Sequence, residues 1–312
     1  MDTVIQIDGL TKWFGNKQAV GGLTLDIPRG AIFALLGENG AGKTTTIRML
    51  TGLLPPDAGW ASILGMNPWR DAIRLRHRLG YVPERPKFYD WMTVSEVGWF
   101  TSGFHAKGFL PRYRKLADRF DLDPAARLGH LSKGQYAKVG LSLALASDPR
   151  VLILDEPTSG LDLLTRREFL ASLVDLAAAG RTVLISSHSI AELEKASTHV
   201  GLLRDGKMIL SATLDDLRKK VRRISLRFAD SPPDPLGLGT VLERNGTGRF
   251  WQVLVQDPDA GAVAALRGGS GVSDFEDAAV TLEEVYAALM ARAAPAAANG
   301  PAIPMVRKVD AT

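Results

Sequence analysis

The stretch from residue 37 to residue 44 limits the fold of this 312-residue chain more than any other part of its sequence. It reads Gly-Glu-Asn-Gly-Ala-Gly-Lys-Thr and follows the apolar run Ala31–Leu36, which is typical of a strand buried on both faces. A glycine-rich turn of this form between a strand and a helix is the pattern of a phosphate-binding loop. We therefore predict a strand at 31–36, this loop, and a helix over 42–53 that ends before Pro55-Pro56.

The composition of this loop predicts how it binds phosphate. Its glycines let backbone N–H groups turn inward to form an anion nest, and the start of the helix adds a positive dipole. Lys43 is expected to reach the β- and γ-phosphates of a nucleotide, and the Thr44 hydroxyl is expected to ligate Mg²⁺. The predicted nucleotide-binding residues of this segment are Gly37, Asn39, Gly40, Ala41, Gly42, Lys43, Thr44 and Thr45.

Two adjacent carboxylates follow a second apolar strand, predicted at 151–154. Ligands of open parallel sheets bind at the carboxyl ends of the strands, which is where Asp155 and Glu156 lie. Asp155 is expected to hold Mg²⁺, directly or through water. Glu156 is expected to polarise an attacking water as a general base. Alone, the segment would also fit a capped strand end, so the catalytic interpretation depends on the phosphate loop.

His188 follows a third apolar strand, predicted at 182–186. A single histidine at a strand end is more often a structural hydrogen-bonding residue. Because this strand is expected to lie next to the one that carries Asp155 and Glu156, we predict that the imidazole reaches a γ-phosphate. The predicted catalytic residues are therefore Lys43, Glu156 and His188.

The succession of elements favours an α/β fold around a parallel sheet. Aromatic and basic residues at helical spacing predict a helical subdomain at about 85–148. The other predicted elements of a first domain, residues 1–217, are strands at 4–10 and 23–27, helices at 166–179 and 190–196, and a hairpin of 200–203 with 208–211 around Asp205-Gly206.

The character of the sequence changes after Leu217. Residues 229–239 are rich in Pro, Gly and Asp and predict a loop or linker. The basic run 218–223 is interpreted as a solvated or membrane-proximal face. Residues 218–292 are predicted to form an accessory α+β domain and 293–312 a disordered tail; the predicted elements are strands at 224–228, 250–255 and 272–275 and helices at 261–266 and 282–292.

Composition excludes several classes of protein. The absence of cysteine excludes disulfides and thiolate metal sites. No apolar run approaches the roughly 18–20 residues of a membrane helix, and the first residues lack the features of a signal peptide, so a cytoplasmic location is expected. The net charge of +4 is spread thinly along the chain, so nucleic acid is not expected as a partner.

Together these motifs resemble those of the ATPase subunit of ABC transporters, over roughly residues 3–216. Residues 37–44 and 152–156 match the family's Walker A and Walker B segments, and His188 stands at the position of its switch histidine. The other matching positions are the signature-like Leu131-Ser132-Lys133-Gly134-Gln135, the D-loop-like Ser159-Gly160-Leu161-Asp162, and Phe14 at the adenine-stacking position, with Trp13 as the alternative.

The resemblance implies a P-loop NTPase core, a parallel sheet with an antiparallel β portion, plus the helical subdomain. It also implies a head-to-tail dimer of two ATPase chains that holds two ATP molecules with Mg²⁺. Each site would take Lys43, Thr44, Asp155, Glu156 and His188 from one chain. From the other chain it would take the D-loop Asp162 and the signature residues, namely Ser132 as helix cap and the free N–H groups of Gly134 and Gln135.

Two positions depart from the family pattern. Most members have a glutamine, in a loop linking core and helical subdomain, where this chain has Glu84 within Gly80–Arg85. Glu84 keeps an oxygen for Mg²⁺ or water but adds negative charge near the γ-phosphate. Lys133 replaces the usual first glycine of the signature. Two positions of its side chain are open, one in contact with phosphate and one pointing to solvent. Drug- and antibiotic-export members resemble this chain in both features and in a C-terminal helix like Thr281–Tyr286.

The resemblance further implies a separate integral-membrane permease, with this chain peripheral on the cytoplasmic face of the membrane. The aromatic and basic segment around 85–105 is expected to dock that permease, or else to pack within the helical subdomain. An importer ATPase and a soluble, non-transport ABC protein are the alternatives. The role of the accessory domain, regulatory or dimer-stabilising, and the transported substrate stay open.

Overall fold

The computed structural model describes residues 2–230, 237–269 and 271–292. The chain divides into two compact units, Met1–Ser211 and Ala212–Thr312, and each has hydrophobic clusters of its own. The division precedes the boundary predicted after Leu217, because helix α8 (Leu214–Lys220) contacts strand β10 (Val221–Phe228) of the second unit.

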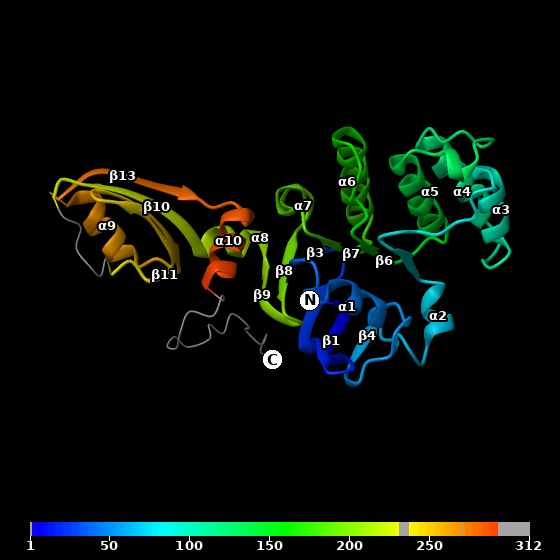
Figure 1. The fold of residues 1–312 in the computed structure, drawn as a ribbon, viewed down its shortest axis with the longest axis horizontal. Coiled ribbons are helices and arrows are strands. Elements are labelled where there is room, and N and C mark those ends of the chain that lie inside the picture. Colours follow the sequence, from blue (N-terminus) through cyan, green and yellow to red (C-terminus); the bar gives the residue numbers. More distant parts are fainter. Residues whose placement is uncertain (1, 231–236, 270, 293–312) are drawn as a thin grey trace. The chain divides into compact units, whose positions relative to one another are not determined.

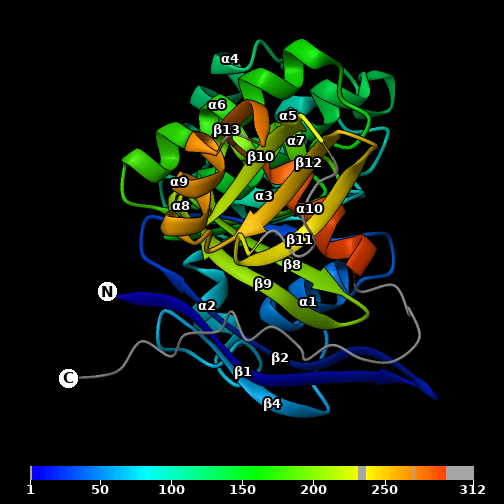
Figure 2. The same ribbon diagram turned by 90° about the vertical axis from the view of Figure 1, so that its left-hand side faces the viewer.

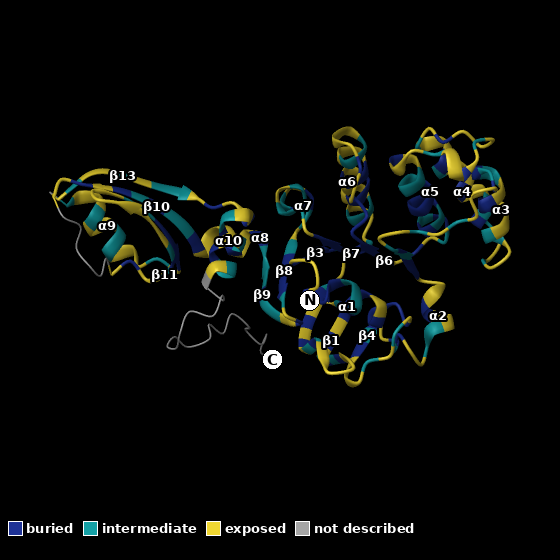
Figure 3. Ribbon diagram, in the orientation of Figure 1, coloured by how far each residue is buried: buried dark blue, intermediate teal, exposed yellow. Residues whose placement is uncertain are grey.

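A six-stranded sheet forms the centre of the first unit, in the order β5-β6-β7-β3-β8-β9. The five neighbours from β5 to β8 pair in parallel, and β3, β6 and β7 are buried along their whole length (Figure 3). Continuous apolar runs therefore mark the strands that have no solvent-exposed face. The strands are β3 (Ile32–Leu36), β5 (Leu79–Val82), β6 (Val151–Asp155), β7 (Thr182–Ser187), β8 (His199–Arg204) and β9 (Lys207–Thr213).

The hairpin between β8 and β9 turns at the predicted Asp205-Gly206. Both residues have positive φ, 48° and 74°, as a two-residue hairpin turn requires. Gly206 also allows a close approach, since a Cβ there would lie 2.7 Å from the Ala19 carbonyl oxygen. The turn thus packs the β8–β9 hairpin directly on strand β2 (Lys17–Pro28), which contains Ala19.

A separate antiparallel sheet, in the order β2-β1-β4, runs along one edge of the first unit (Figure 2). Its strands are β1 (Thr3–Phe14), β2 (Lys17–Pro28) and β4 (Ala58–Ile63). The parallel sheet with an antiparallel portion is therefore confirmed, and both predicted N-terminal strands are longer than expected. Strand β4 was not predicted, because only its last residues alternate between more and less buried positions.

Helices surround the central sheet, and α3, α4 and α5 gather in one lobe (Figure 1). That lobe encloses its own cluster around Tyr113, whose hydroxyl donates to the Val94 carbonyl at 2.7 Å. The helices are α1 (Lys43–Leu50), α2 (Ala72–Arg76), α3 (Val94–Ser102), α4 (Phe109–Arg119), α5 (Lys133–Ala146), α6 (Leu163–Ala178) and α7 (Ile190–Ala196), with a 3₁₀ turn at Leu128–His130.

The prediction of a loop at 80–85 is wrong for its first residues. Leu79–Val82 forms β5, which pairs in parallel with β6 at the edge of the central sheet. Four residues are too few to show the alternation of apolar and polar residues that is typical of a strand. The strand forms because its backbone pairs with β6. Only the segment from Pro83 onward links core and helical lobe as a loop.

The second unit is a four-stranded antiparallel sheet in the order β11-β12-β10-β13. Helix α9 packs on its apolar face through Ala262, Val263 and Leu266, which confirms the small α+β fold. Its elements beyond α8 and β10 are β11 (Thr240–Thr247), which was not predicted, β12 (Phe250–Gln256), α9 (Ala260–Gly268), β13 (Val272–Ala279) and α10 (Leu282–Arg292).

The basic run at 218–223 is not simply a solvated face. Arg222 pairs with Asp277 at 2.8 Å and Arg223 pairs with Glu284 at 2.5 Å, so two of its cations hold β10 to β13 and to α10. The tail predicted at 293–312 lies outside the described residues. Among the helices that the structure describes, none combines the length and the apolarity that a bilayer span requires.

Candidate active site

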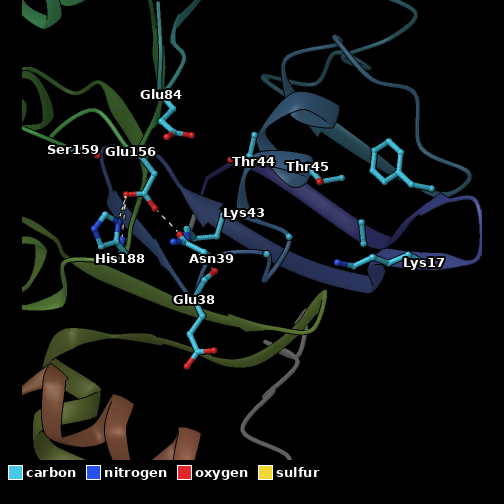
Figure 4. Close-up of a pocket in the computed structure, with 14 residues that line it drawn as sticks. Lys17, Glu38, Asn39, Lys43, Thr44, Thr45, Glu84, Glu156, Ser159 and His188 are labelled. Atoms are coloured by element: carbon cyan, nitrogen blue, oxygen red, sulfur yellow. Dashed lines mark hydrogen bonds and ion pairs between the residues drawn. The ribbon is translucent and has the colours of Figure 1, made fainter. Parts of the chain in front are cut away.

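A cavity of about 460 Å³ opens where β3, β6 and β7 end, a volume typical of small-molecule sites (Figure 4). Ten of the predicted site residues line it: Phe14, Asn39, Gly40, Gly42, Lys43, Thr44, Thr45, Glu84, Glu156 and His188. Four further lining residues were not predicted: Lys17, Ala19, Glu38 and Ser159. Residues from five separate parts of the chain thus meet at one edge of the sheet.

The phosphate loop reaches this cavity through backbone conformations that favour glycine. Gly40 and Gly42 have φ values of 87° and 106°. A Cβ on Gly42 would also lie 2.6 Å from the Ala19 carbonyl oxygen, so the loop packs directly on β2. Gly42 precedes α1 and supplies no side-chain cap, so the first amides of that helix are available to an anion.

Lys43 lies at the bottom of the cavity and is 5% exposed. Its ammonium donates to the carbonyl oxygens of Gly37 at 2.6 Å and Glu38 at 3.2 Å. It also forms an ion pair with Glu156 Oε1 at 3.2 Å. Buried ammonium groups require such partners, and these three hold the charge facing the cavity.

Asp155 is almost fully buried beside the cavity, at 1% exposure. Its Oδ1 accepts hydrogen bonds from Thr44 Oγ1 at 3.1 Å and from Ser186 Oγ at 2.8 Å. Burial raises the pKa of this carboxyl above its usual value, although the two hydroxyl donors act in the opposite direction. The carboxylate is therefore a desolvated anion that a nearby cation would stabilise.

The predicted magnesium ligands fit the ion chemically. Thr44 and Asp155 are in direct contact, and Glu84 lines the same cavity as Thr44. Hydroxyl and carboxylate oxygens are the hard donors that Mg²⁺ takes together with substrate phosphates. In the part of the chain that the structure describes, no cluster of three or more His, Asp or Glu forms a metal cage, and Mg²⁺ does not require one.

Glu84 extends from the loop after β5, and its side chain is 45% exposed. Arg85, its neighbour, lies 3.7 Å away as a weak ion pair. The negative charge of Glu84 contributes to the raised pKa of Asp155, after burial and the adjacent Glu156. The extra negative charge of Glu84 that the sequence predicted therefore acts on Asp155 at the candidate metal site, where it raises the pKa of that carboxyl.

Glu156 adopts a strained backbone conformation, with φ of 48° in the left-handed region. Its amide donates to Ser186 Oγ at 2.9 Å, which fixes the chain just after β6. The carboxylate is buried between two basic side chains: Oε1 faces Lys43, and Oε2 lies 2.8 Å from His188 Nδ1 (Figure 4). Strand β7 adjoins β6 as predicted, so His188 is brought to Glu156 by the sheet.

The two oxygens of Glu156 differ in their surroundings. Oε2 is occupied by the ring and the backbone amide of His188, at 2.8 and 3.3 Å. Oε1 is buried, and among the described residues no group donates a hydrogen bond to it. Oε1 lies 3.2 Å from the Lys43 ammonium, so it faces a cation without a directed hydrogen bond and keeps lone pairs that can accept a proton from water.

Phe14 lines the cavity and is 52% exposed, so its ring is accessible for stacking. Trp13, the alternative, does not line the cavity; its amide donates to Asp57. Lys17 is the direct partner of Phe14 in the β1–β2 register and also lines the cavity, while the ammonium of Lys12 lies 5.9 Å from the centroid of the Phe14 ring. The turn at Gly15-Asn16 was the sequence signal for this pairing, but the exact register was not readable.

Besides the buried Asp155, six predicted positions lie outside the cavity lining, and they are Gly37, Ala41, Ser132, Gly134, Gln135 and Asp162. Asp162 caps α6 by accepting from the amides of Leu164 and Thr165, and hydrogen bonds from Thr165 lower its pKa. The structure therefore gives Asp162 a helix-capping role within its own chain.

The Gln135 amide is not free, contrary to the sequence prediction. It donates to Ser132 Oγ at 3.2 Å, while the Gln135 side chain accepts from the Ser132 amide at 3.0 Å. This reciprocal pair is a capping box at the start of α5. The Ser132 hydroxyl keeps its own proton for donation, because it acts here only as an acceptor.

Lys133 lies along the turn after Glu156. A Cβ on Gly160 would be 3.4 Å from its ammonium nitrogen, so the side chain lies over this glycine of its own chain. Gly134 is equally close to α6, where a Cβ would meet Thr165 at 3.1 Å. The signature-like segment is thus packed on the D-loop-like segment through Lys133 and on α6 through Gly134.

Comparisons with known proteins agree with this geometry. Residues 20–159 match the ABC transporter family. A bacitracin transport ATP-binding protein of Bacillus licheniformis is 35% identical over 227 residues, which cover 72% of this chain and 74% of that protein. A Nod factor export ATP-binding protein of Burkholderia lata is 37% identical over 215 residues, 66% of this chain and 69% of its own.

A solved structure, an ATP-binding subunit of an ABC transporter, superposes with a TM-score of 0.64 at 29% identity and covers 69% of this chain and 92% of its own. This part of the chain therefore shares its fold with a protein of known architecture. The chain belongs to the family of ATP-binding subunits of ABC transporters, whose cassettes bind and hydrolyse ATP.

Proposed function

We propose that this chain hydrolyses ATP to ADP and phosphate and thereby powers export of a substrate through a separate integral-membrane permease. Two copies would bind two ATP molecules between them at the cytoplasmic face of the membrane. The observation that carries the catalytic part is the placement of Glu156, whose buried Oε1 faces Lys43 while Oε2 is held by His188.

This arrangement supports general-base catalysis. In the reaction, the oxygen of a water molecule forms a bond to the γ-phosphorus, the bond from that phosphorus to its bridging oxygen breaks, and ADP leaves. The water proton passes to Glu156, which has a free acceptor oxygen. Lys43 stabilises negative charge on the phosphoryl group, and His188 orients the carboxylate.

Thr44, Asp155 and Glu84 would hold Mg²⁺. The ion would supply charge neutralisation for the phosphates when bound. Phe14 would stack on adenine, and Lys17 adds a cation on the same side of the cavity. The nest of amides at Gly40–Lys43 would hold the phosphates.

A second chain is required because the cavity opens to solvent on the side of His188, whose ring is 57% exposed. Ser132 of an opposing copy would donate its free hydroxyl proton to the γ-phosphate, together with the amide of Gly134. Closing that side removes water and completes the electrostatic environment, so ATP binding favours the dimer.

The permease is proposed to contact an aromatic surface, defined as Tyr89, Trp91, Trp99, Phe100 and Phe104. These side chains are between 42% and 70% exposed. The rings of Tyr89 and Phe100 lie 6.4 Å apart and those of Phe100 and Phe104 lie 5.5 Å apart. A continuous exposed aromatic surface of this kind marks an interaction site.

The other interpretation of this segment applies to its first aromatic residue. Phe88 packs on Tyr136 at a ring distance of 5.0 Å, and its amide donates to the Tyr136 hydroxyl. Phe88 thus packs on the core of the helical lobe, whereas the five side chains of the aromatic surface are exposed. Export is favoured over import because a relative carries export in its name.

Substitution Glu156→Gln tests the proposed chemistry. We expect it to abolish measurable turnover, to leave ATP binding within about twofold, and to stabilise an ATP-dependent dimer, because the amide cannot accept the proton. ATPase rates, nucleotide titration and sedimentation measure these three properties. Glu168→Gln on α6 is the control, since Glu168 is an exposed carboxylate that pairs with Lys138. An unchanged turnover rate in the Glu156 variant would refute the assigned base.

Two measurements separate the alternatives. Co-purification of the chain with an integral-membrane protein from detergent-solubilised membranes distinguishes a transporter subunit from a soluble ABC protein. Uptake of labelled substrate into inside-out vesicles, driven by ATP, distinguishes an exporter from an importer. The transported substrate is decided by the permease, whose identification by pull-down is the first step.

A further inference from the structure

Arg166, near the start of α6, joins two segments that flank the candidate active site. Its NH2 group donates to the Leu161 carbonyl at 2.8 Å, within the turn 158–162 that follows Glu156. Its NH1 group pairs with Glu192 on α7. The side chains of Arg166 and Glu192 are only 25% and 21% exposed, so solvent and salt screen this ion pair less than a surface pair.

These contacts close a ring of interactions around Glu156. The Glu156 carbonyl accepts from the Ser159 amide at 3.2 Å, which starts the turn. The Glu156 carboxylate is held by His188, and α7, which carries Glu192, begins two residues after His188. Arg166 connects Glu192 back to the turn. Neither Arg166, Leu161 nor Glu192 lines the cavity, whereas Ser159 and His188 do.

The residue type suits this role. A guanidinium presents donors in a rigid planar fork and can bond a carboxylate and a carbonyl in different directions at once. A lysine in the same place would offer a single point charge on a flexible stem, and would hold one of the two segments at a time. The pair of contacts therefore fixes the distance between the turn and α7.

We propose that Arg166 is a positioning residue that sets the turn 158–162 and the loop carrying His188 in one fixed relation, so that displacement of either segment moves the other. The inference rests on the proposed ATPase function. When an opposing chain contacts the turn, the Arg166–Glu192 pair transmits that contact to His188 and so to Glu156. The same pair carries movement of His188 outward to the turn.

The test is a double-mutant cycle in the full-length chain, with Arg166→Met, Glu192→Gln and the double variant. We expect kcat to fall about tenfold in each single variant, with KM for ATP and the affinity for ATP unchanged, because misplacement affects the transition state and the cavity lining is intact. The double variant should be no slower than the slower single variant, since both changes break one connection. Arg166→Lys should restore only part of the rate.

Arg119→Met is the matched control. Arg119 also pairs with an acidic residue of a neighbouring element, Asp175 at 3.0 Å, but both side chains are at least 60% exposed. We expect its kcat to equal that of the unmodified chain. Thermal unfolding of each variant shows whether a loss of rate follows from loss of the fold; if Arg166→Met does not fold, Glu192→Gln and Arg166→Lys carry the test.

Each outcome decides a specific point. Unchanged kcat in folded Arg166→Met and Glu192→Gln, or additive losses in the double variant, would overturn the positioning role while the ATPase function stands. A rise in KM without a fall in kcat would overturn it too, because the defect would then lie in nucleotide binding. If the unmodified chain and Arg119→Met hydrolyse no ATP when the permease is present, the proposed function itself fails.

Discussion

Two neighbouring carboxylates, Asp155 and Glu156, have opposite tasks because the backbone turns between them. Asp155 is the last residue of β6 and lies against Thr44 and Ser186. Glu156 has a positive φ, which directs its carboxylate to Lys43 and His188 instead. Adjacent side chains of a strand point to opposite faces. The left-handed backbone conformation of Glu156 is what brings its carboxylate to the cavity.

Burial of Asp155 makes a prediction about stability. Because its folded pKa is raised above the ordinary value, its contribution to folding is fully present below that value and is lost as pH rises through the folded pKa. The charged form of the carboxylate therefore destabilises the nucleotide-free protein. Asp155→Asn should raise the thermal midpoint at neutral pH, and the difference should shrink as the pH is lowered toward about 4.

Asp57→Asn provides a control of opposite sign. A hydrogen bond from Lys12 and another from the Trp13 amide lower the pKa of Asp57. Its ionised form therefore stabilises the fold above the ordinary pKa, and the amide variant should have a lower midpoint at neutral pH. Calorimetric scans of both variants across pH check these directions; a lower neutral midpoint for Asp155→Asn would contradict the first.

For single residues, the sequence predicted which side chains are reactive better than it predicted which residues they contact. Lys43, Asp155, Glu156 and His188 were predicted because their motifs name both the residue and its place at a strand end. Lys17 was missed because its role depends on a register of one hairpin. The Gln135 amide was wrongly predicted to be free because a glutamine three residues after the cap was not weighed as a capping partner.

Strands that carry a continuous apolar run buried on both faces were the most predictable elements. Strands β3, β6 and β7 each contain a continuous apolar run, are buried along their whole length, and were placed within two residues of their ends. Short elements such as β5 and α2 were not predicted, since four or five residues carry no period and form through contact with a neighbour. The helical lobe was expected as a region, without its individual helices.

Packing between α3 and α4 gives a prediction at this scale. A Cβ on Gly98 would lie 2.1 Å from the ring of Tyr113, which is 1% exposed and cannot move aside. Gly98→Ala should therefore destabilise the chain by about 1–3 kcal/mol through overpacking, although alanine favours the helix. Urea unfolding followed by tryptophan fluorescence measures the loss.

Gly103→Ala is the matched control at the end of the same helix. Its φ of −63° suits any residue, and a Cβ there would meet Phe100 only at 3.4 Å. We expect a change within about 0.5 kcal/mol. Equal effects of the two substitutions would mean that the contact with Tyr113 does not limit position 98.

At the scale of the whole molecule, the two units make a calorimetric prediction. Each has separate hydrophobic clusters, so we expect the full chain to unfold in two transitions. ATP with Mg²⁺ at about 100 times its Kd should stabilise one transition by about 2.7 kcal/mol and leave the other unchanged. Lys43→Ala should remove that shift, since it deletes the cation of the phosphate site.

A single transition, or an equal shift of both, would show that the accessory unit is energetically part of the ATPase unit. Separate transitions would instead allow the accessory unit to act on a second chain without altering nucleotide binding in its own. The sequence left the role of this unit open, and the calorimetric result decides between these two arrangements.

The sequence by itself determined the identity of the reactive groups and the strands that carry them, because a phosphate loop and carboxylates at strand ends are local patterns with a fixed chemical purpose. Tertiary structure alone decided how those groups face one another. Glu156 meets Lys43 and His188 only when β3, β6 and β7 lie in their observed order, and Arg166 meets Leu161 and Glu192 only when α6 packs beside α7. Such contacts depend on the pairing of segments distant in the chain, which no local pattern of residues encodes.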